Sequence, residues 1–441
     1  MRKTVGLLTI IASFISNGMV FGQQKLDAYF EHLFKNRKFM GSVAVSYHDS
    51  IIYSKSVGYA DVDAERKIDG NTKFRIASIT KTFTAVLVLK AVEEQKLHLD
   101  DKLSLYYPEV KNAAKISIEQ MLNHRSGIFN FTEKPGEDQW QQHPHTEQEF
   151  VDFFVNEPAS FEPGTSYAYS NTNYALLGFI LEKIYHKSYA ELLDEKICQP
   201  LHLVNTYYSF EVDSAKDEAL SYNIQDRYIR NSRVNFSNHP GSGGIASNAV
   251  DLNKFLFALF NGKLISPGSL AKMLPMDKGE YGLGIEKLSF NSPEGFGHSG
   301  RLENYISDYW YFPKENLGIV TLANATNIDT DDIGVVLVKY AYGSMPELPD
   351  FNNVPGLSHE VFDSIRGTYY LEQPKSTITI SSDGRNLVFQ DSRSGQDFVP
   401  FEYDGNNAFH FGDIKLQFFP AKREVELEQD GIKVTYKSGT R

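Results

Sequence analysis

The chain has 441 residues, of which 41% are hydrophobic and 13% aromatic, and its formal charge is −12. This length and hydrophobic content allow a sizeable core and more than one domain, and they exclude a disordered or fibrous protein. An acidic chain without clustered lysine and arginine is a poor nucleic-acid binder, because neutralising phosphates requires such clusters. We therefore expect small molecules or carbohydrate-peptide polymers as partners, and no nucleic acid.

The first 22 residues have the order of a secretory signal peptide. Arg2 and Lys3 precede an apolar run, and Val20 and Gly22 occupy the two positions that fix a cleavage site. Polar residues interrupt this run, which is already short for a membrane span, and no later stretch is long and apolar enough for one. We expect an exported protein, periplasmic or secreted, without a transmembrane segment in the mature chain.

Hydrophobic periodicity predicts helices and strands in a mixed α/β order. Residues 25–34 have apolar positions at helical spacing, and residues 41–61 read as two strands around a turn at 48–50. Further elements follow in chain order: a helix from Ser78 to about Gln95, a long and mostly helical middle, and strand signals over 281–290, 306–313 and 317–326. Strands at both ends with helices between them predict one sheet built from distant segments, with an inserted helical lobe.

The composition changes near residue 346, where three prolines and a glycine fall within residues 345–356. Beyond this segment, short alternating strands recur every 8 to 12 residues between Asp-Gly turns, which predicts a separate all-β barrel or sandwich. We therefore expect four parts: a signal peptide over 1–22, a main domain over 23–345, a linker over 346–356, and a small β-barrel of the lipocalin-like kind over 357–441.

Ser78 and Lys81 lie three positions apart at the start of an apolar helix. A serine hydroxyl must lose its proton to an adjacent base before it attacks a carbonyl, and residues one helical turn apart lie within reach of each other. Burial lowers the pKa of a lysine toward that of a useful base, and the helix N-terminus favours a developing oxyanion. Taken alone, the pair also fits a serine N-cap beside a solvated lysine.

Tyr169 and Asn171 follow a Pro-Gly turn and precede a predicted helix. A phenol near a lysine can shuttle a proton, and an asparagine amide can hold the lysine and bind a substrate carbonyl. The alternative interpretation is an asparagine helix cap beside a packing tyrosine.

His298, Ser299 and Gly300 open a predicted strand. A glycine at this point lets another backbone approach closely, and the next N–H group, that of Arg301, can supply a second oxyanion donor. Taken alone, a histidine-serine-glycine sequence fits an ordinary loop equally well.

In this order, Ser78-x-x-Lys81, Tyr169-x-Asn171 and His298-x-Gly300 resemble the three motifs of the penicillin-recognising serine hydrolases. These are the class C β-lactamases, D-alanyl-D-alanine carboxypeptidases, D-aminopeptidases and related esterases. The resemblance covers roughly residues 26 to 340 and includes the stretches "MLNHRSGI" and "FEPGTSYAYSN". It implies an α+β (α/β) fold with an antiparallel sheet flanked by helices, an all-helical lobe, and a covalent acyl-serine mechanism that uses no metal and no organic cofactor.

The resemblance also implies a role for each motif residue. Ser78 attacks the carbonyl, Lys81 and Tyr169 form the general-base pair, and Asn171 holds the lysine. The N–H groups of Ser78 and Arg301 form the oxyanion hole, beside Ser299 and Gly300. The implied substrates are D-amino-acid peptides, β-lactams or related amides; a small-ester carboxylesterase and a slow-turnover β-lactam or peptidoglycan receptor are the alternatives.

Two departures from the family pattern bear on the substrate. Class C β-lactamases usually have lysine where His298 stands, whereas histidine resembles the D-specific peptidases and some esterases. Since histidine titrates near neutrality, we expect an activity limb between about pH 6 and 8 that changes with His298→Lys. Arg301 and Glu303 place charges where relatives usually have small residues. The C-terminal domain is expected to flank the cleft or to mediate self-association, as in relatives with such appendages.

Three other features are assigned structural roles. The single cysteine, Cys198, is expected to be a buried packing residue rather than a nucleophile. His143 and His145 have no third metal ligand at a recognisable spacing and are expected in a surface loop. Residues 241–247 are rich in glycine but lack the ending of a phosphate-binding loop, so we expect tight backbone turns near the site.

Overall fold

The computed structural model describes residues 22–225, 227–231, 234–235, 240–275, 281–289, 293–354, 356–372, 376–391, 399–429 and 431–438. Its contacts divide the chain into two compact units. The larger unit comprises residues 41–220 and 231–324, and the smaller one comprises the N-terminal segment to residue 40, residues 221–230 and the chain from residue 325 onward. The expected signal peptide falls on residues 1–21, which lie outside the described part, and on Gly22.

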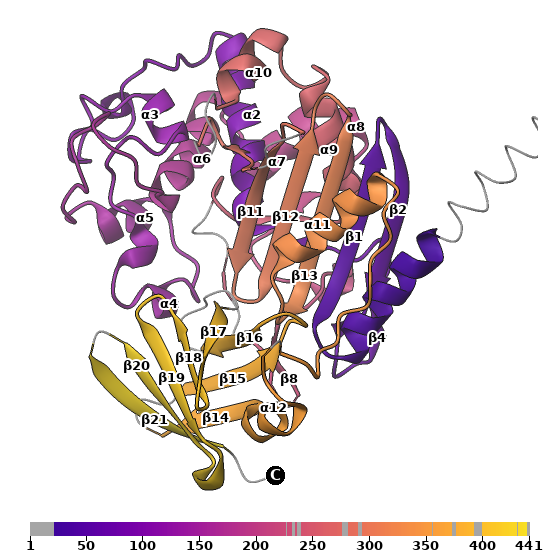
Figure 1. Ribbon diagram of the computed structural model, residues 1–441. Helices are drawn as coiled ribbons and strands as arrows, with labels where there is room; N and C mark the ends of the chain where they lie inside the picture. The colour runs from indigo at the N-terminus through magenta and orange to yellow at the C-terminus, as the bar shows by residue number, and fades with distance from the viewer. Residues whose placement is uncertain are drawn as a thin grey trace, which may run out of the picture. The chain divides into compact units, whose positions relative to one another are not determined.

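A six-stranded sheet is the centre of the larger unit (Figure 1). Its strands, in spatial order, are β10 (Glu286–Lys287), β11 (Phe296–Leu302), β12 (Tyr305–Phe312), β13 (Leu317–Thr326), β1 (Phe39–Tyr47) and β2 (Ser50–Val57). Consecutive pairs from β10 to β13 are antiparallel, as is the β1–β2 hairpin. The prediction of one sheet built from both ends of the chain is confirmed, because β1 lies beside β13.

The central strands consist mainly of β-branched and aromatic residues, and every residue of β12 and β13 is buried. The strand predicted over 281–290 is much shorter in the structure, where only Glu286 and Lys287 are regular. Gly284 has a φ of 73°, which ends an extended conformation, and its carbonyl accepts a hydrogen bond from Thr82 at 2.8 Å. This bend brings the segment onto the neighbouring helix.

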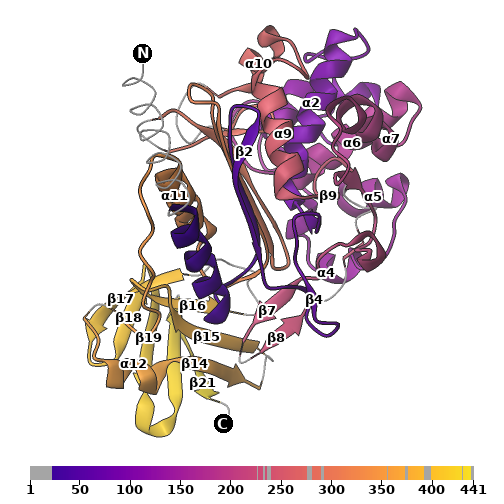
Figure 2. The same ribbon diagram turned by 90° about the vertical axis from the view of Figure 1, so that its right-hand side faces the viewer.

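Helices α2 (Thr80–Glu93) and α9 (Ala249–Phe260) lie on the same side of the sheet (Figure 2). The rings of Phe83 in α2 and Phe255 in α9 stack with centroids 3.7 Å apart. A hydrogen bond of 3.0 Å between Thr82 and the Tyr309 hydroxyl ties α2 to β12. These contacts fix α2, and with it the Ser78 turn that precedes the helix, against the core.

The predicted helical middle is confirmed. Its helices are α3 (Ile118–Leu122), α4 (Glu137–Trp140), α5 (Glu147–Phe154), α6 (Asn171–Tyr185), α7 (Tyr189–Leu193) and α8 (Gln199–Leu201), with a π-helical turn at Asp194–Cys198 and a later helix, α10 (Pro267–Met273). Helices α3, α5 and α7 each begin with a capping box at Ser117, Thr146 and Ser188, which explains where they start. Short strands β5 (Phe74–Arg75), β9 (Ile245–Ser247) and β6 (Tyr207–Tyr208) form a second sheet, and β3 (Tyr59–Asp61) pairs with β4 (Arg66–Lys67).

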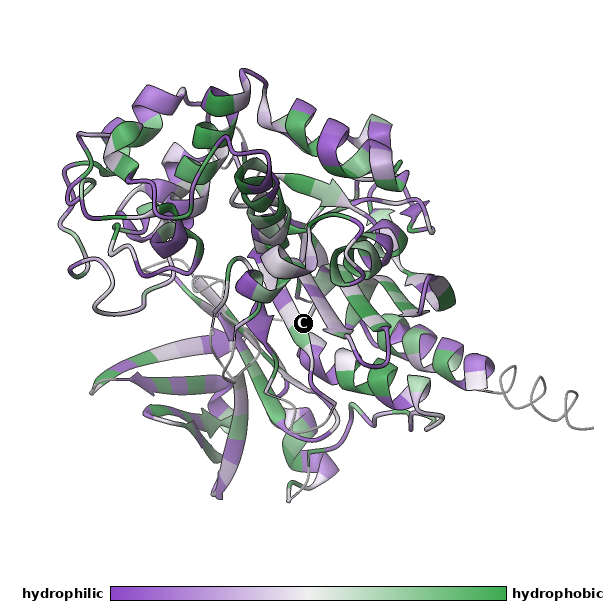
Figure 3. Ribbon diagram, turned by 90° about the horizontal axis from the view of Figure 1, so that it is seen from above, coloured by the Kyte–Doolittle hydropathy of each residue, from purple (hydrophilic) through white to green (hydrophobic). Residues whose placement is uncertain are grey.

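The smaller unit contains a closed eight-stranded barrel. Its strands are β14 (Gly367–Leu371), β15 (Ser376–Ser382), β16 (Leu387–Asp391), β17 (Val399–Gly405), β18 (Ala408–Phe411), β19 (Ile414–Phe419), β20 (Glu424–Gln429) and β21 (Ile432–Ser438), and β14 pairs with β21 to close it. Alternation of hydrophobic and hydrophilic residues along these strands turns one set inward (Figure 3). The inward set packs the interior with side chains such as Ile378, Phe409 and Tyr436.

The same unit contains the N-terminal helix (residues 22–35), α11 (Thr330–Ala341), α12 (His359–Ile365) and the hairpin of β7 (Tyr222–Ile224) and β8 (Tyr228–Arg230). The segment expected as a linker is packed within this unit. The Nε2–H of His32 donates to the Pro349 carbonyl at 2.8 Å, the His32 ring stacks on Phe351, and Val354 is buried. The domain limits at residues 345 and 357 stay a prediction. In the described part of the chain, no helix is long and apolar enough to cross a bilayer.

Candidate active site

Ser78 occupies one turn of 3-10 helix, η1 (Ala77–Ile79), directly before α2. Ala77 has a φ of 46°, a left-handed conformation that is unfavourable for a residue with a side chain, so the backbone here is strained. The hydroxyl of Ser307 in β12 donates to the carbonyl of Ile76 at 2.8 Å and holds the turn. Ser78 thus stands at the N-terminal end of the helix, as predicted, although regular α-helix begins only at Thr80.

Lys81 is fully buried, and its amine faces three oxygen atoms. The distances from Nζ are 3.0 Å to Ser78 Oγ, 2.8 Å to Asn171 Oδ1 and 2.8 Å to the carbonyl oxygen of Ser242. Burial lowers the pKa of Lys81 well below its ordinary value. A neutral amine has two N–H groups, which the asparagine and the carbonyl engage, and its lone pair is then left for the Ser78 hydroxyl.

Tyr169 lies beside the same pair. Its ring centroid is 5.0 Å from Lys81 Nζ. Burial raises the pKa of the Tyr169 phenol, the interaction with Ser78 opposes this rise, and the negative charge of Glu286 adds to it. The phenol is therefore protonated at neutral pH.

Asn171 is the first residue of α6, and its amide is oriented by two residues of the 3-10 turn at Phe131–Glu133 and its N-cap. Its backbone N–H donates to Asn130 Oδ1 at 3.0 Å, and its Nδ2 donates to Thr132 Oγ1 at 3.3 Å. These contacts leave Oδ1 facing Lys81. The structure therefore brings the first two predicted motifs together into one hydrogen-bonded group.

His298 is 5% exposed and lies on β11. Its Nδ1 lies 2.6 Å from the Ser299 carbonyl oxygen and its Nε2 lies 2.8 Å from the hydroxyl of Tyr281. The carbonyl can only accept, so Nδ1–H donates to it and the tyrosine donates to Nε2. Burial lowers the pKa of His298 to about 3, and Lys81 contributes. The expectation that this residue titrates between pH 6 and 8 is wrong, because burial desolvates the imidazole and the nearby Lys81 disfavours its charged form.

Gly300 allows β11 to approach the Ser78 turn. A Cβ atom at this position would overlap the carbonyl oxygen of Ile76 and the Oγ of Ser307, so only glycine fits here. The close backbone approach predicted for this glycine is confirmed. Ser299 is exposed next to it, and Arg301 is the following residue of the strand. The role of the Arg301 N–H as an oxyanion donor stays a prediction.

Three residues of this group were not predicted as contributors from the sequence. Ser242 lies in the glycine-rich stretch that was expected to turn near the site, and its carbonyl provides the third oxygen atom at Lys81. Tyr281, the partner of His298, had no signal beyond its place in a predicted strand. His124 lies within the stretch "NHRSG", and its ring centroid is 4.3 Å from that of Tyr169. The family-like stretch was the only available signal for this histidine.

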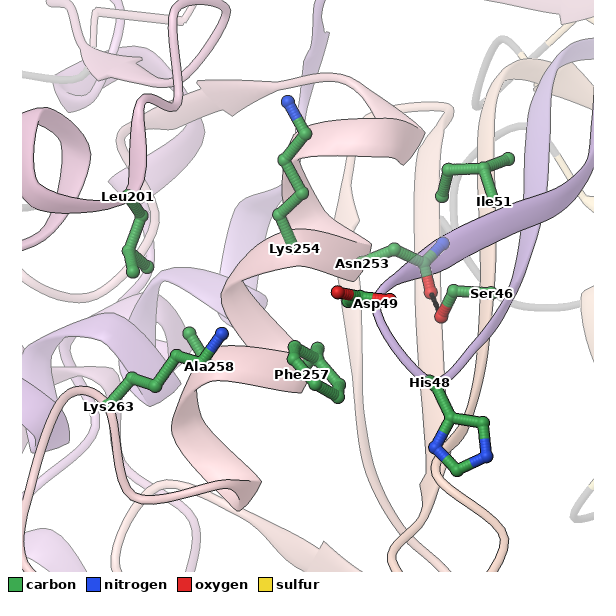
Figure 4. Close-up of a pocket in the computed structure, with 10 residues that line it drawn as sticks. All are labelled: Ser46, His48, Asp49, Ile51, Leu201, Asn253, Lys254, Phe257, Ala258 and Lys263. Carbon is green, nitrogen blue, oxygen red and sulfur yellow. Dashed lines mark hydrogen bonds between the residues drawn. The ribbon is translucent and has the colours of Figure 1, made fainter.

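A separate pocket of about 240 Å³ lies between the β1–β2 turn and α9 (Figure 4). Its floor contains a hydrogen bond of 2.8 Å between Ser46 and Asn253, and the Nδ2 of Asn253 donates to the backbone carbonyls of Ala44 and Ala249. The side chains of Ser46 and Asn253 thus already have hydrogen-bond partners within the protein. None of the predicted site residues lines the pocket.

The features assigned structural roles agree with those assignments. Cys198 is 3% exposed, and burial raises its pKa to about 12, so it is an unreactive packing residue. His145 stacks on Trp140 with ring centroids 3.9 Å apart, and His143 is exposed beside it. Across the described ranges, no three His, Cys, Asp or Glu side chains form a group that could hold a metal ion.

Comparison with known proteins assigns the chain to a family. Residues 26–336 match the profile of the Beta-lactamase family. Protein flp of Staphylococcus aureus (strain MRSA252) is 28% identical over 322 residues, which are 68% of this chain and 63% of flp. The chain thus spans less than two thirds of the length of this curated relative.

Two solved structures share the fold. The D-amino acid amidase from Ochrobactrum anthropi SV3, solved with L-phenylalanine, has 26% identity and a TM-score of 0.61 over 70% of this chain and 92% of its own. The octameric penicillin-binding protein homologue from Pyrococcus abyssi has 22% identity and a TM-score of 0.64 over 94% of this chain and 99% of its own, and it shows the fold alone. Because the family profile covers more than half of the residues, the chain belongs to the beta-lactamase family, the penicillin-recognising serine hydrolases that its three motifs resemble.

Proposed function

We propose that this protein is a serine hydrolase that forms an acyl-enzyme at Ser78 and cleaves amide bonds. The observation that carries this proposal is the Lys81 amine, which is fully buried, has a strongly lowered pKa and lies 3.0 Å from Ser78 Oγ. The substrate class is D-amino-acid peptides and amides, with β-lactams as related substrates. Similarity to a D-amino acid amidase over most of the hydrolase region supports this class.

In the acylation step, the Ser78 Oγ–H bond breaks and its proton moves to the lone pair of Lys81. The oxygen forms a bond to the substrate carbonyl carbon, and the π electrons of that carbonyl move onto its oxygen. The N–H groups of Ser78 and Arg301 bind the resulting oxyanion in this scheme. Asn171 and Ser242 fix the amine during the transfer, since each lies 2.8 Å from it.

Tyr169 serves as the acid for the leaving group. When the tetrahedral intermediate collapses, the C–N bond breaks and the nitrogen takes a proton from the phenol, which regains one from the Lys81 ammonium. The raised pKa of Tyr169 keeps this proton available at neutral pH. An amine leaving group requires such a proton, whereas a nitrophenolate does not, so this geometry supports the cleavage of amides as well as of activated esters. In deacylation, water attacks the acyl carbon and gives a proton to the Lys81 amine. The bond between that carbon and Ser78 Oγ then breaks, the proton passes to Oγ, and the carboxylic acid leaves.

The test measures covalent modification of Ser78 and turnover in parallel. Intact mass spectrometry after incubation with a fluorophosphonate and with penicillin should show one adduct on the wild type and none on Ser78→Ala. Lys81→Ala should acylate at least about 10²-fold more slowly. Lys90→Ala provides the matched control, because Lys90 lies on the same helix but is half-exposed.

Substrate panels then separate the alternatives. Turnover of D-phenylalanine amide and D-alanyl dipeptides in preference to their L forms supports the proposal. Turnover restricted to nitrophenyl esters would indicate an esterase, and a penicillin adduct that persists would indicate a slow-turnover receptor. Absence of any adduct on folded wild-type protein would refute the acyl-serine mechanism itself.

We also propose that the protein is exported and that its barrel domain mediates self-association. The N-terminal helix buries Leu26 and Phe30, and both residues remain in the chain after cleavage at Gly22. Mass spectrometry of protein secreted by a bacterial host should show a chain that begins at Gln23. Ile432 on β21 is 67% exposed, and Ile432→Glu should lower the assembly mass measured by light scattering. A monomeric wild type would contradict the second proposal.

A further inference from the structure

His124 is connected to both neighbours of Tyr169 in sequence. The backbone N–H of Ala168 donates to the carbonyl of His124 at 3.1 Å, and the backbone N–H of Ser170 donates to His124 Nδ1 at 3.1 Å. The ring of Tyr169 lies between these two contacts, with its centroid 4.3 Å from that of the imidazole. One residue thus fixes the chain on either side of the phenol and also contacts the phenol ring.

The imidazole is itself held by a buried hydrogen-bond chain. The Nδ2 of Asn173 lies 3.3 Å from His124 Nδ1, and the Oδ1 of Asn173 accepts from Ser126 Oγ at 2.6 Å. All three side chains are essentially inaccessible to solvent. Ser126 and His124 belong to one loop and Asn173 to the first turn of α6, so this chain fixes the loop against the helix that begins just after Tyr169.

The proton of this imidazole must reside on Nε2. Nδ1 accepts hydrogen bonds from two N–H groups, so this nitrogen is unprotonated and uses its lone pair as the acceptor. Burial lowers the pKa of His124 well below its ordinary value, and Lys81 and His298 contribute, so the ring stays neutral. Nε2 is buried and has no hydrogen-bond partner among the described residues. The ring centroids of Tyr174 and Tyr281 lie 5.3 and 4.6 Å from that of the imidazole.

This arrangement is unfavourable for stability alone. An N–H group buried without a partner is destabilising, and the residue also has a φ of 59°, which favours glycine and asparagine. A side chain selected only for packing would have neither feature. The feature that the position requires is therefore an acceptor at the δ1 atom, which the hydrogen bond from Ser170 engages.

We infer that His124 is the positioning residue for Tyr169, setting the phenol beside Ser78 and Lys81. This inference rests on the proposed function, because it assigns His124 a role through the tyrosine that protonates the leaving group. His124 itself does not touch the reacting atoms.

The test compares two substitutions that differ in where they offer an acceptor. The Oδ1 of an asparagine side chain can take the place of imidazole Nδ1, and asparagine tolerates the left-handed backbone. His124→Asn should therefore retain kcat within about threefold. His124→Gln has no acceptor at that atom, and it should lower kcat for an amide substrate by about 10- to 100-fold with little change in KM. Melting temperatures of both variants identify any general loss of fold.

A double-mutant cycle gives the readout that a purely structural role would not change. In a Tyr169→Phe background, His124→Gln should slow Ser78 acylation, followed by intact mass, by less than about twofold. Equal losses for the asparagine and glutamine variants, or a full loss in the phenylalanine background, would overturn the inference. If the glutamine variant does not fold, Ser126→Ala provides the test, because it removes the hydrogen bond that holds Asn173 against His124 Nδ1. Acylation should then be about 3- to 10-fold slower with Tyr169 present and unchanged in the Tyr169→Phe background. Failure of the wild type to form any adduct would instead refute the proposed function.

Discussion

The contact between Gly300 and the Ser78 turn offers a direct test of how β11 builds the site. An alanine here would place its Cβ less than 3.0 Å from both the carbonyl oxygen of Ile76 and the Oγ of Ser307, closer than real Cβ atoms approach other heavy atoms. Neither neighbour can rotate away easily, because one is backbone and the other donates to that same carbonyl at 2.8 Å. The strand and the turn must therefore separate by several tenths of an ångström.

Two effects follow from that separation. Overpacking of a rigid core by one methyl group costs about 1–3 kcal/mol, so Gly300→Ala should reduce the free energy of unfolding by about 2 kcal/mol. A displacement approaching 1 Å within a catalytic group can lower the rate by about 10²-fold, so kcat should fall by about 10- to 100-fold. The fall should occur in acylation, the step in which the oxyanion forms.

Gly243→Ala is the matched control. Apart from its two chain neighbours, no described residue has a heavy atom within 4 Å of the Cβ position at Gly243, and its φ is not positive. It follows the residue whose carbonyl binds Lys81. Urea unfolding and burst-phase acylation should be close to wild type for this variant. If Gly300→Ala matched Gly243→Ala in both measurements, the close approach of β11 would not be needed for the site.

Three further predictions concern charge. Lys38 is 4% exposed, and burial lowers its pKa to about 7. Between pH 7 and 10.5 the unfolded chain therefore binds more protons than the folded chain, and the free energy of unfolding rises with pH. Lys38→Met should flatten that rise and stabilise the protein at pH 7 by up to about 4 kcal/mol, as measured by urea unfolding; an unchanged pH slope would contradict this. Because the pKa of His298 is about 3, His298→Asn should leave any limb of kcat/KM between pH 6 and 8 where it is in the wild type, and a limb that disappears would restore the histidine as the titrating group. The charge of Glu286 raises the pKa values of Tyr167, Tyr169 and Tyr281. Glu286→Gln should therefore raise KM about fivefold for substrates with a free ammonium group and should not raise it for N-acylated ones. Equal KM changes for both would show that the carboxylate does not face the substrate.

Local sequence patterns predicted the fold because they reflect burial directly. The hairpin turn predicted at residues 48–50 joins β1 and β2, and the Asp383-Gly384 turn lies between strands β15 and β16 of the barrel. Two barrel strands, β14 and β18, were not predicted, because their five and four residues lack a clear alternation. The predicted strand near Gly284 was too long, since the bend there depends on a hydrogen bond to Thr82 in a distant helix.

In the site, too, local spacing predicted some features, and contacts between distant segments decided the others. Spacing alone indicated that Ser78 and Lys81 lie within reach of each other, because one helical turn fixes their separation. Spacing could not indicate that His298 would have a low pKa, because that depends on burial and on the neighbouring Lys81. A histidine at a motif position therefore predicts its place in the site better than its protonation state.

Helix α2 shows why the serine-lysine pair needs its fold to become reactive. The helix has two lysines, and for both of them burial lowers the pKa. Lys90 also lies near Glu93 and Glu94, whose charges favour its ammonium form, whereas Lys81 is fully buried and its polar contacts are all to uncharged oxygen atoms. An amine in that environment gains nothing from charge pairing, so its neutral form is the stable one, and the adjacent serine has a base. The same four-residue motif on a solvated helix would leave the lysine protonated and the serine inert. Reactivity in this protein therefore comes from the apolar sequence of α2 as much as from the motif that it contains.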